Sequence, residues 1–519
     1  MPGLTSPLQP VQSVVGQQFQ PVTHHHQQHQ PHNYQGGVAN RYGVLGNHHG
    51  NGFIATDGPV QRPAMQPPAP VPSSAQPPVS NVTEALQLLN TSQDRLISGL
   101  TRSQLNVNFA GGAAPGMTLL HYAAMQGANT ECLKALIAFG ADVNPLNGHG
   151  LTPLDLAIMS HPAGGEMVNL LEAVGAVKGT DLTHGCQPVG EAHSIERNGT
   201  HILSVPSSGP YCIVQLQVLQ QIEAQCRHKI TTLFQWIVAC GFGALFLLLV
   251  IYGNKAVSEV KRLYFKLREE VFSEPDMARR SQALDGFLQA HLGTQMKMSD
   301  LQQPRILIGA LYKGSTKVEI RLFNNCLNDE YSDFPVWKVA RYTCSLPLNV
   351  MECDNYVSTN PALPNLSSLA LRRIRQFYSD AGEDPDVVRS LVCVEAGQCD
   401  ASELGCIDVP ASALSEAVSS PSPSPSSLWF TSHGALQRLA HLLTLHHSSA
   451  SAASEESLRC CQELCEAYDI RFHHFNPLLP PFATLSIDVP LKDLVESVMH
   501  TIAQVVGKPL HQLVTDIIK

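Results

Sequence analysis

Apolar residues beyond position 200 alternate between helical and strand spacings. Residues 212–226 carry Ile213, Leu216, Leu219 and Ile222 on one face of a helix. Similar spacings predict further helices over 257–272, 283–292, 337–343, 457–467 and 491–506. Short apolar runs predict strands over 201–204, 305–312, 317–323, 391–395 and 470–475. Strands that alternate with helices indicate an α/β domain, with a mostly parallel sheet covered by helices, over 201–515.

A different pattern precedes this domain. The segment GMTLLHYAA begins at Gly116, and GLTPLDLA begins at Gly150, which sets Thr118 and Thr152 34 residues apart. This period and signature are typical of ankyrin repeats, in which the threonine caps the first helix and a glycine such as Gly140 ends the second. We predict an all-α ankyrin block over 82–178, with about two clear copies and a decayed copy that ends near 105–108.

Three segments have the composition of linkers or tails. Residues 1–81 are rich in Gln, His and Pro, and we predict a disordered tail there because so few apolar residues cannot offset the entropy of ordering. Residues 179–200 are expected to be a linker. A Ser/Pro-rich insertion is expected near 411–427.

Residues 230–254 form a run of 25 residues without a charged side chain. The length allows a transmembrane helix. The alternative is a buried strand over 233–238, a tight turn over 240–243 and a buried helix over 244–252. The glycines at 241 and 243 fit the turn and are poor residues for the middle of a helix, which favours the second interpretation.

The predicted turn lies where a nucleophile elbow is found in hydrolases. In the motif G-x-S-x-G, a strained turn between a strand and a helix presents a serine hydroxyl. Here the turn reads Ala239-Cys240-Gly241-Phe242-Gly243, so the final glycine is present and Gly241 occupies the serine position. Glycine has no nucleophile. The thiol of Cys240 is one position away, and at a tight turn its side chain should point elsewhere.

Over roughly residues 85–515, the chain resembles the group VI calcium-independent phospholipases A2, in which ankyrin repeats precede a patatin-like catalytic domain. The stretches that share order and spacing with the family are 233–238, 261–272, 322–325, 336–341 and 472–477. The resemblance implies a patatin-like fold and a Ser–Asp dyad, in which a glycine-rich loop stabilises the oxyanion.

The resemblance also implies positions for the family's catalytic elements in this chain. The resemblance sets the nucleophile at Gly241 and the dyad aspartate at Asp354, which we expect to be vestigial. The elbow also includes Cys240, Phe242 and Gly243. The oxyanion loop corresponds to residues 204–210 and has lost most of its glycines; its central positions are Ser207, Ser208 and Gly209.

Composition narrows the range of functions. The formal net charge is −10, and no basic cluster predicts a nucleic-acid partner. The 14 cysteines include no C-x-x-C pair, so a reduced, cytoplasmic protein is expected. The histidines around His24 to His32 lack rigid spacing, and we predict no metal site and no cofactor.

Three functional hypotheses follow. The first is a catalytically inactive phospholipase homologue that associates with phospholipid or the membrane surface. It would contact proteins through the ankyrin block and form homo-oligomers or mixed oligomers with an active relative. The second is an active calcium-independent acyl hydrolase that releases sn-2 fatty acids. The third is an ankyrin-repeat protein that spans a membrane at 230–254.

Overall fold

The computed structural model describes most of the chain between residues 85 and 518. The described ranges are 85–89, 91–103, 106–110, 115–161, 165–184, 199–206, 211–327, 329–346, 350–359, 365–397, 455–479 and 490–518. The predicted tail at 1–81 and the predicted insertion near 411–427 lie outside them. The chain divides into two compact units, Met1–Pro72 and Ser73–Lys519, and every described residue belongs to the second.

The N-terminal part of the described chain is helical, as the ankyrin pattern predicts. Its helices are α2 (Gln93–Ser103), α3 (Leu119–Gln126), α4 (Thr130–Phe139), α5 (Pro153–Ser160), α6 (Glu166–Ala173) and α7 (Gly179–His184). Helix α7 lies within the stretch expected to be a linker, so the first residues of that stretch are helical.

The caps of these helices explain why the repeats begin and end where they do. Thr118 and Thr152 are the N-caps of α3 and α5, and each forms a capping box with the residue three positions later. Gly140 ends α4 in the left-handed region, at φ +112°. The predicted roles of these threonines and of Gly140 are therefore confirmed.

One mixed sheet organises the rest of the chain. Its strands are β1 (Thr200–Val205), β2 (Trp236–Cys240), β3 (Arg305–Lys313), β4 (Val318–Asn324), β5 (Tyr356–Val357), β6 (Val388–Val394) and β7 (Arg471–Phe475). They lie in the order β4-β3-β2-β1-β6-β7, and β5 also pairs with β3. Strands β3, β2, β1, β6 and β7 are parallel to one another, whereas β4 and β5 are antiparallel to β3.

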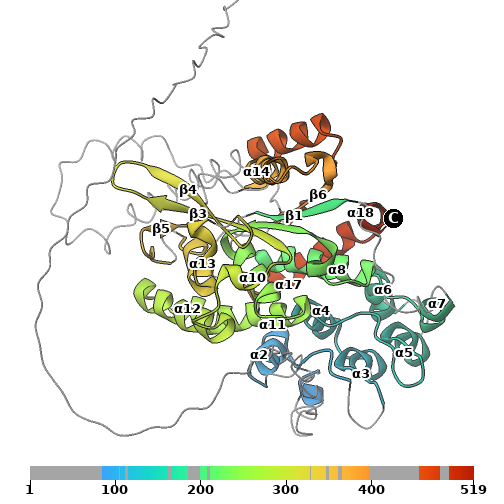
Figure 1. Ribbon diagram of the computed structural model, residues 1–519. Coiled ribbons are helices and arrows are strands. Elements are labelled where there is room, and N and C mark those ends of the chain that lie inside the picture. The colour runs from blue at the N-terminus through green and yellow to red at the C-terminus, as the bar shows by residue number, and fades with distance from the viewer. Residues whose placement is uncertain are drawn as a thin grey trace, which may run out of the picture. The chain divides into compact units, whose positions relative to one another are not determined.

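Helices cover both faces of the sheet (Figure 1). One face packs against α8 (Cys212–Cys226), α10 (Gly241–Ile251) and α13 (Val336–Thr343), and α11 (Val257–Leu267) and α17 (Leu491–Val505) pack in turn against α8. The other packs against α14 (Ser367–Asp380) and the helix at 455–467. Along β2, Trp236 and Val238 face the α14 side while Ile237 and Ala239 face the α10 side, which is the two-residue period of a strand buried on both faces.

Several boundaries differ from those expected. Helix α12 (Met277–Leu292) begins earlier than predicted, with Asp276 as its N-cap, and α11 ends in a π-helical turn, Arg268–Phe272. Helices α14 and α18 (Lys508–Ile518) were not expected, and α18 extends past the expected domain end at 515. The 3-10 turns are Met298–Asp300, Glu330–Ser332 and Pro385–Val387.

The charge-free segment 230–254 is divided among three elements: the short helix α9 (Ile230–Leu233), strand β2 and helix α10. This arrangement agrees with the strand–turn–helix interpretation and corrects the alternative of a single span, because the backbone reverses at Gly241. Among the described residues, no helix combines the length and the apolar character that a membrane crossing requires.

The ankyrin helices contact the α/β region directly. The rings of Phe139 in α4 and Phe265 in α11 stack with centroids 5.4 Å apart. The ammonium of Lys261, which is completely buried, donates to the carbonyl of Ile137 at 3.1 Å. Since few repeats rarely bury their hydrophobic faces alone, these contacts complete the core of the ankyrin block.

Candidate functional site

The elbow lies between β2 and α10, at the carboxyl end of the parallel strands. Strand β2 ends at Cys240, and Gly241 begins the helix with φ at +61°. In this region of φ a Cβ atom is strained and glycine is not. The backbone therefore makes the sharp strand-to-helix turn that a nucleophile elbow requires, and the residue at its apex has no side chain.

The backbone of Gly241 is fixed by helix α13. Its N–H donates to the Thr343 hydroxyl at 2.7 Å, and that hydroxyl donates to the carbonyl of Gly309 at 2.9 Å. The Cys344 thiol lies 3.5 Å from the Gly241 carbonyl. These contacts hold the turn in place from the neighbouring strand β3 and helix α13, without any side chain at position 241.

The other elbow residues serve packing. A Cβ atom on Gly243 would lie 2.7 Å from Cγ1 of Val205 and 3.2 Å from the carbonyl oxygen of Pro206, so only glycine lets α10 approach the end of β1 this closely. Phe242 is buried against Phe272. Cys240 is completely buried in the core on the α14 side, so its thiol faces away from the α10 side of the sheet.

Asp354 occupies a tight turn between Cys353 and Tyr356. Asp354 and Asn355 have φ at +51° and +65°, which is the pattern of a type I′ turn. The carboxylate accepts hydrogen bonds from the Tyr342 hydroxyl at 2.7 Å and from the Lys338 ammonium at 3.0 Å. These bonds lower the pKa of the Asp354 carboxyl. A lowered pKa makes the group a weaker proton acceptor.

Helix α13 links the elbow to the aspartate. Two consecutive residues of that helix are involved: Tyr342 contacts Asp354, and Thr343 contacts Gly241. The two residues that the resemblance assigns to the dyad, Gly241 and Asp354, are therefore both contacted by one helix. The three residues assigned to the oxyanion loop, Ser207, Ser208 and Gly209, lie outside the described residues.

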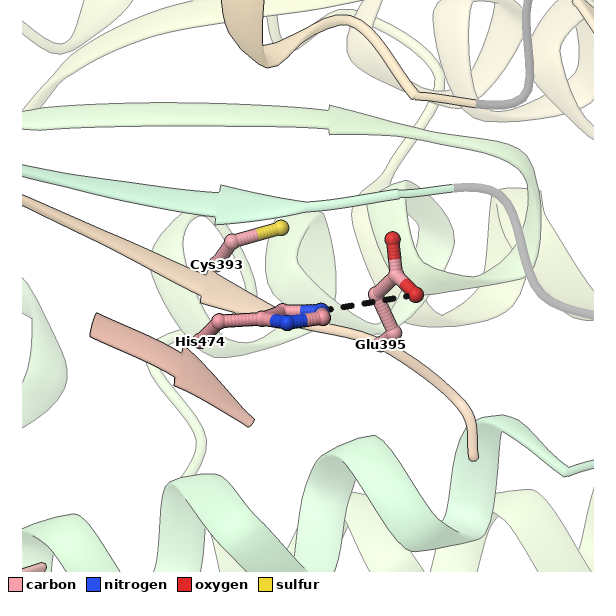
Figure 2. Close-up of side chains that lie close together, drawn as sticks. All are labelled: Cys393, Glu395 and His474. Atoms are coloured by element: carbon pink, nitrogen blue, oxygen red, sulfur yellow. Dashed lines mark ion pairs between the residues drawn. The ribbon is translucent and has the colours of Figure 1, made fainter. Parts of the chain in front are cut away.

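A second group of reactive side chains was not predicted from the sequence. Cys393 and Glu395 follow one another with a spacing of two at the end of β6, and His474 lies on the adjacent strand β7 (Figure 2). The spacing of two indicates that Cys393 and Glu395 share a face. Only the pairing of Cys393 with His474 across the two strands brings the third group to them.

Together these features define a class of protein: ankyrin repeats that contact an α/β domain whose elbow lies between a central strand and a buried helix. Comparison with known proteins supports the interpretation of the N-terminal helices as ankyrin repeats. A family model for ankyrin repeats matches residues 86–181 with three copies.

The chain is also homologous to calcium-independent phospholipases A2. It is 23% identical over 239 residues to the 85/88 kDa calcium-independent phospholipase A2 of Rattus norvegicus, a match that covers 41% of this chain and 29% of the rat protein. The Mus musculus protein of the same name gives the same values. Identity to an intracellular phospholipase A2 of Caenorhabditis elegans is 23% over 343 residues, or 54% of this chain and 31% of the relative. The chain thus spans less than one third of the length of these relatives.

Proposed function

We propose that this chain is a patatin-like phospholipase A2 homologue that does not hydrolyse lipids and acts as a lipid-associated scaffold or regulator in phospholipid metabolism. The observation that carries the proposal is Gly241, at the apex of an otherwise well-formed elbow. Acyl transfer through a covalent intermediate needs a hydroxyl or thiol at that point. Loss of a hydrolase nucleophile lowers kcat by a factor on the order of 10⁶.

The surroundings of Asp354 support the same proposal. A working general base needs a pKa near the operating pH. The pKa of this carboxyl is lowered, and its charge is paired with Lys338 at 3.0 Å. Its side chain is 50% exposed to solvent. The group therefore has the contacts of an ordinary turn residue in an ion pair.

The proposed role places the protein in the cytoplasm, in peripheral contact with membranes. Its ankyrin block would bind protein partners, and an active phospholipase is one candidate for a mixed oligomer. The phospholipase names of the relatives favour the alternative of an active hydrolase, and an activity measurement separates the two.

The test measures release of sn-2 fatty acid from labelled phosphatidylcholine vesicles without calcium. The full chain is compared with Gly241→Ser, with Asp354→Asn and with the double variant Gly241→Ser, Asp354→Asn. Gly382→Ser is the matched control, because Gly382 also has a positive φ, of +73°, and a Cβ there would meet no atom within 4 Å. Flotation with the same vesicles measures lipid binding separately.

The proposal expects binding to vesicles and no release by the native chain. If Gly241→Ser gains activity and the double variant loses it, the remaining site is still shaped for the dyad reaction. Release by the native chain that Asp354→Asn abolishes would overturn the proposal in favour of an active phospholipase. Failure to bind vesicles would overturn the lipid-associated role.

A further inference from the structure

Cys393, Glu395 and His474 converge at the carboxyl end of strands β6 and β7, as Figure 2 shows. The thiol sulfur, a carboxylate oxygen and an imidazole nitrogen all lie within 4.8 Å of one another. Nε2 of His474 is 3.6 Å from Oε2 of Glu395. Cys393 is completely buried, whereas the side chains of His474 and Glu395 are 26% and 15% exposed. The group is thus closed on the core side and reached by solvent on the other.

Buried polar side chains orient two of these three groups. The amide nitrogen of Asn365 donates to Oε1 of Glu395 at 3.0 Å and lies 3.6 Å from the sulfur of Cys393. The Ser367 hydroxyl lies 3.8 Å from the same sulfur. Asn365 is itself fixed, because its side-chain oxygen accepts from the Ser367 N–H at 2.9 Å. Burial and the neighbouring Glu395 raise the pKa of the Cys393 thiol above its ordinary value, against the opposing effect of these two donors.

An ion pair between Glu395 and His474 accounts for only part of this arrangement. It explains neither the thiol directly opposite His474 nor the donors that point to the sulfur. Loss of the thiol proton beside a carboxylate is unfavourable without a cation between the two groups, because like charges in a site of low dielectric repel each other. One sulfur, one nitrogen and one oxygen ligand are the set that zinc accepts.

We propose that Cys393, Glu395 and His474 bind one Zn²⁺ ion, which fastens β7 to β6 at the carboxyl end of the sheet. Zinc lies about 2.3 Å from sulfur and about 2.0–2.2 Å from nitrogen and oxygen ligands. The three ligand atoms, which lie within 4.8 Å of one another, would have to move closer together to reach these distances. Asn365 and Ser367 would be the outer residues that hold the metal ligands in place.

The site is tested on the full chain with Co²⁺ as a spectroscopic substitute for zinc. After treatment with a chelator, the protein is titrated with Co²⁺, and its absorbance is followed through the near-ultraviolet thiolate-to-cobalt charge-transfer bands and the visible d–d bands. Direct Zn²⁺ titration by calorimetry then gives the affinity and the stoichiometry. The variants are Cys393→Ser, Glu395→Gln and His474→Gln.

Two controls separate this site from other metal ligands in the chain. His500→Gln changes an exposed histidine on α17, outside the site. The triple variant His24→Gln, His25→Gln, His26→Gln removes three imidazoles from the histidine-rich N-terminal segment, which contains no cysteine and so supplies no thiolate. Both controls keep the charge-transfer band if the proposal is correct. Circular dichroism establishes that each variant is folded, and His474→Gln remains informative if the buried Cys393→Ser does not fold.

The proposal expects one equivalent of metal, with a thiolate band that Cys393→Ser abolishes. It also expects His474→Gln and Glu395→Gln to lower the zinc affinity by about tenfold or more. Zinc raises the midpoint of thermal unfolding of the native chain and not of the folded variants. Cobalt binding without a thiolate band would overturn the proposal and assign the metal to the histidine-rich segment. Absence of binding would also overturn it.

Discussion

The ankyrin block keeps the side chains of its sequence motif, whereas the elbow keeps the backbone conformation of its motif. In the ankyrin block the side chains that the pattern demands are present and make their contacts: Thr118 and Thr152 both cap helices. At the elbow, Gly241 and Gly243 meet the backbone requirements, and Gly241 has no side chain at the position where the resemblance sets the nucleophile. Positions that specify a fold and positions that perform a reaction can therefore be retained independently of each other.

The largest expected change in stability comes from a side chain at Gly243. Gly243→Ala sets a Cβ 2.7 Å from Val205, so we expect a loss of about 2 kcal/mol in the free energy of unfolding. Gly286→Ala in α12 is the control, because a Cβ there meets no atom within 4 Å, and we expect a gain of about 0.5–1 kcal/mol. Urea unfolding of both variants measures the difference. A Gly243→Ala variant as stable as the native chain would mean that α10 does not need its close approach to β1.

The corresponding change in the ankyrin block removes a side chain. Thr152→Ala deletes a buried hydroxyl that accepts from the Asp155 N–H and lies 2.9 Å from the Val177 carbonyl. The expected loss is about 1–2 kcal/mol in the free energy of unfolding. Thr130→Ala removes a hydroxyl whose bond to Glu166 is exposed, and it should cost less than about 0.5 kcal/mol. Equal unfolding midpoints for the two variants would contradict the role of Thr152 as a cap.

The stability of the variant Gly241→Ala shows whether the elbow has room for a side chain. A residue with a Cβ at φ +61° should cost about 1–2 kcal/mol from backbone strain alone. Gly382→Ala gives the same strain at φ +73° where nothing surrounds the Cβ. Equal losses in urea unfolding would mean that the site above Gly241 is open. A larger loss at Gly241 would mean that neighbouring atoms have closed over the nucleophile position, and that restoring a serine cannot restore hydrolysis.

Much of this architecture can be predicted from the sequence, because it depends on local patterns. The helical spacing over 212–226 gave the bounds of α8, and the two elbow glycines distinguished a strand–turn–helix from a continuous span. Helix α14 has the same kind of signal, with Ala370, Leu371 and Ile374 buried on one face, although it was not predicted. The cluster at Cys393 could not be predicted, since it depends on which strand pairs with β6 and in which register.

The smallest expected effect concerns Asp354, the aspartate that the resemblance pairs with the elbow. Its folded pKa lies below the ordinary value because Tyr342 and Lys338 donate to the carboxylate. The stabilisation is therefore present above about pH 4, where the unfolded carboxyl is ionised, and it is lost as the pH falls through the lower folded value. Since half of the side chain is exposed, Asp354→Asn should cost less than about 1 kcal/mol at neutral pH. Lys338→Met should cost a similar amount. Urea unfolding at neutral and acidic pH, with NMR titration of the carboxyl, measures both properties. A titration midpoint near neutral pH would instead identify Asp354 as a group that can still accept a proton. The site would then have a base at Asp354 and no nucleophile at Gly241.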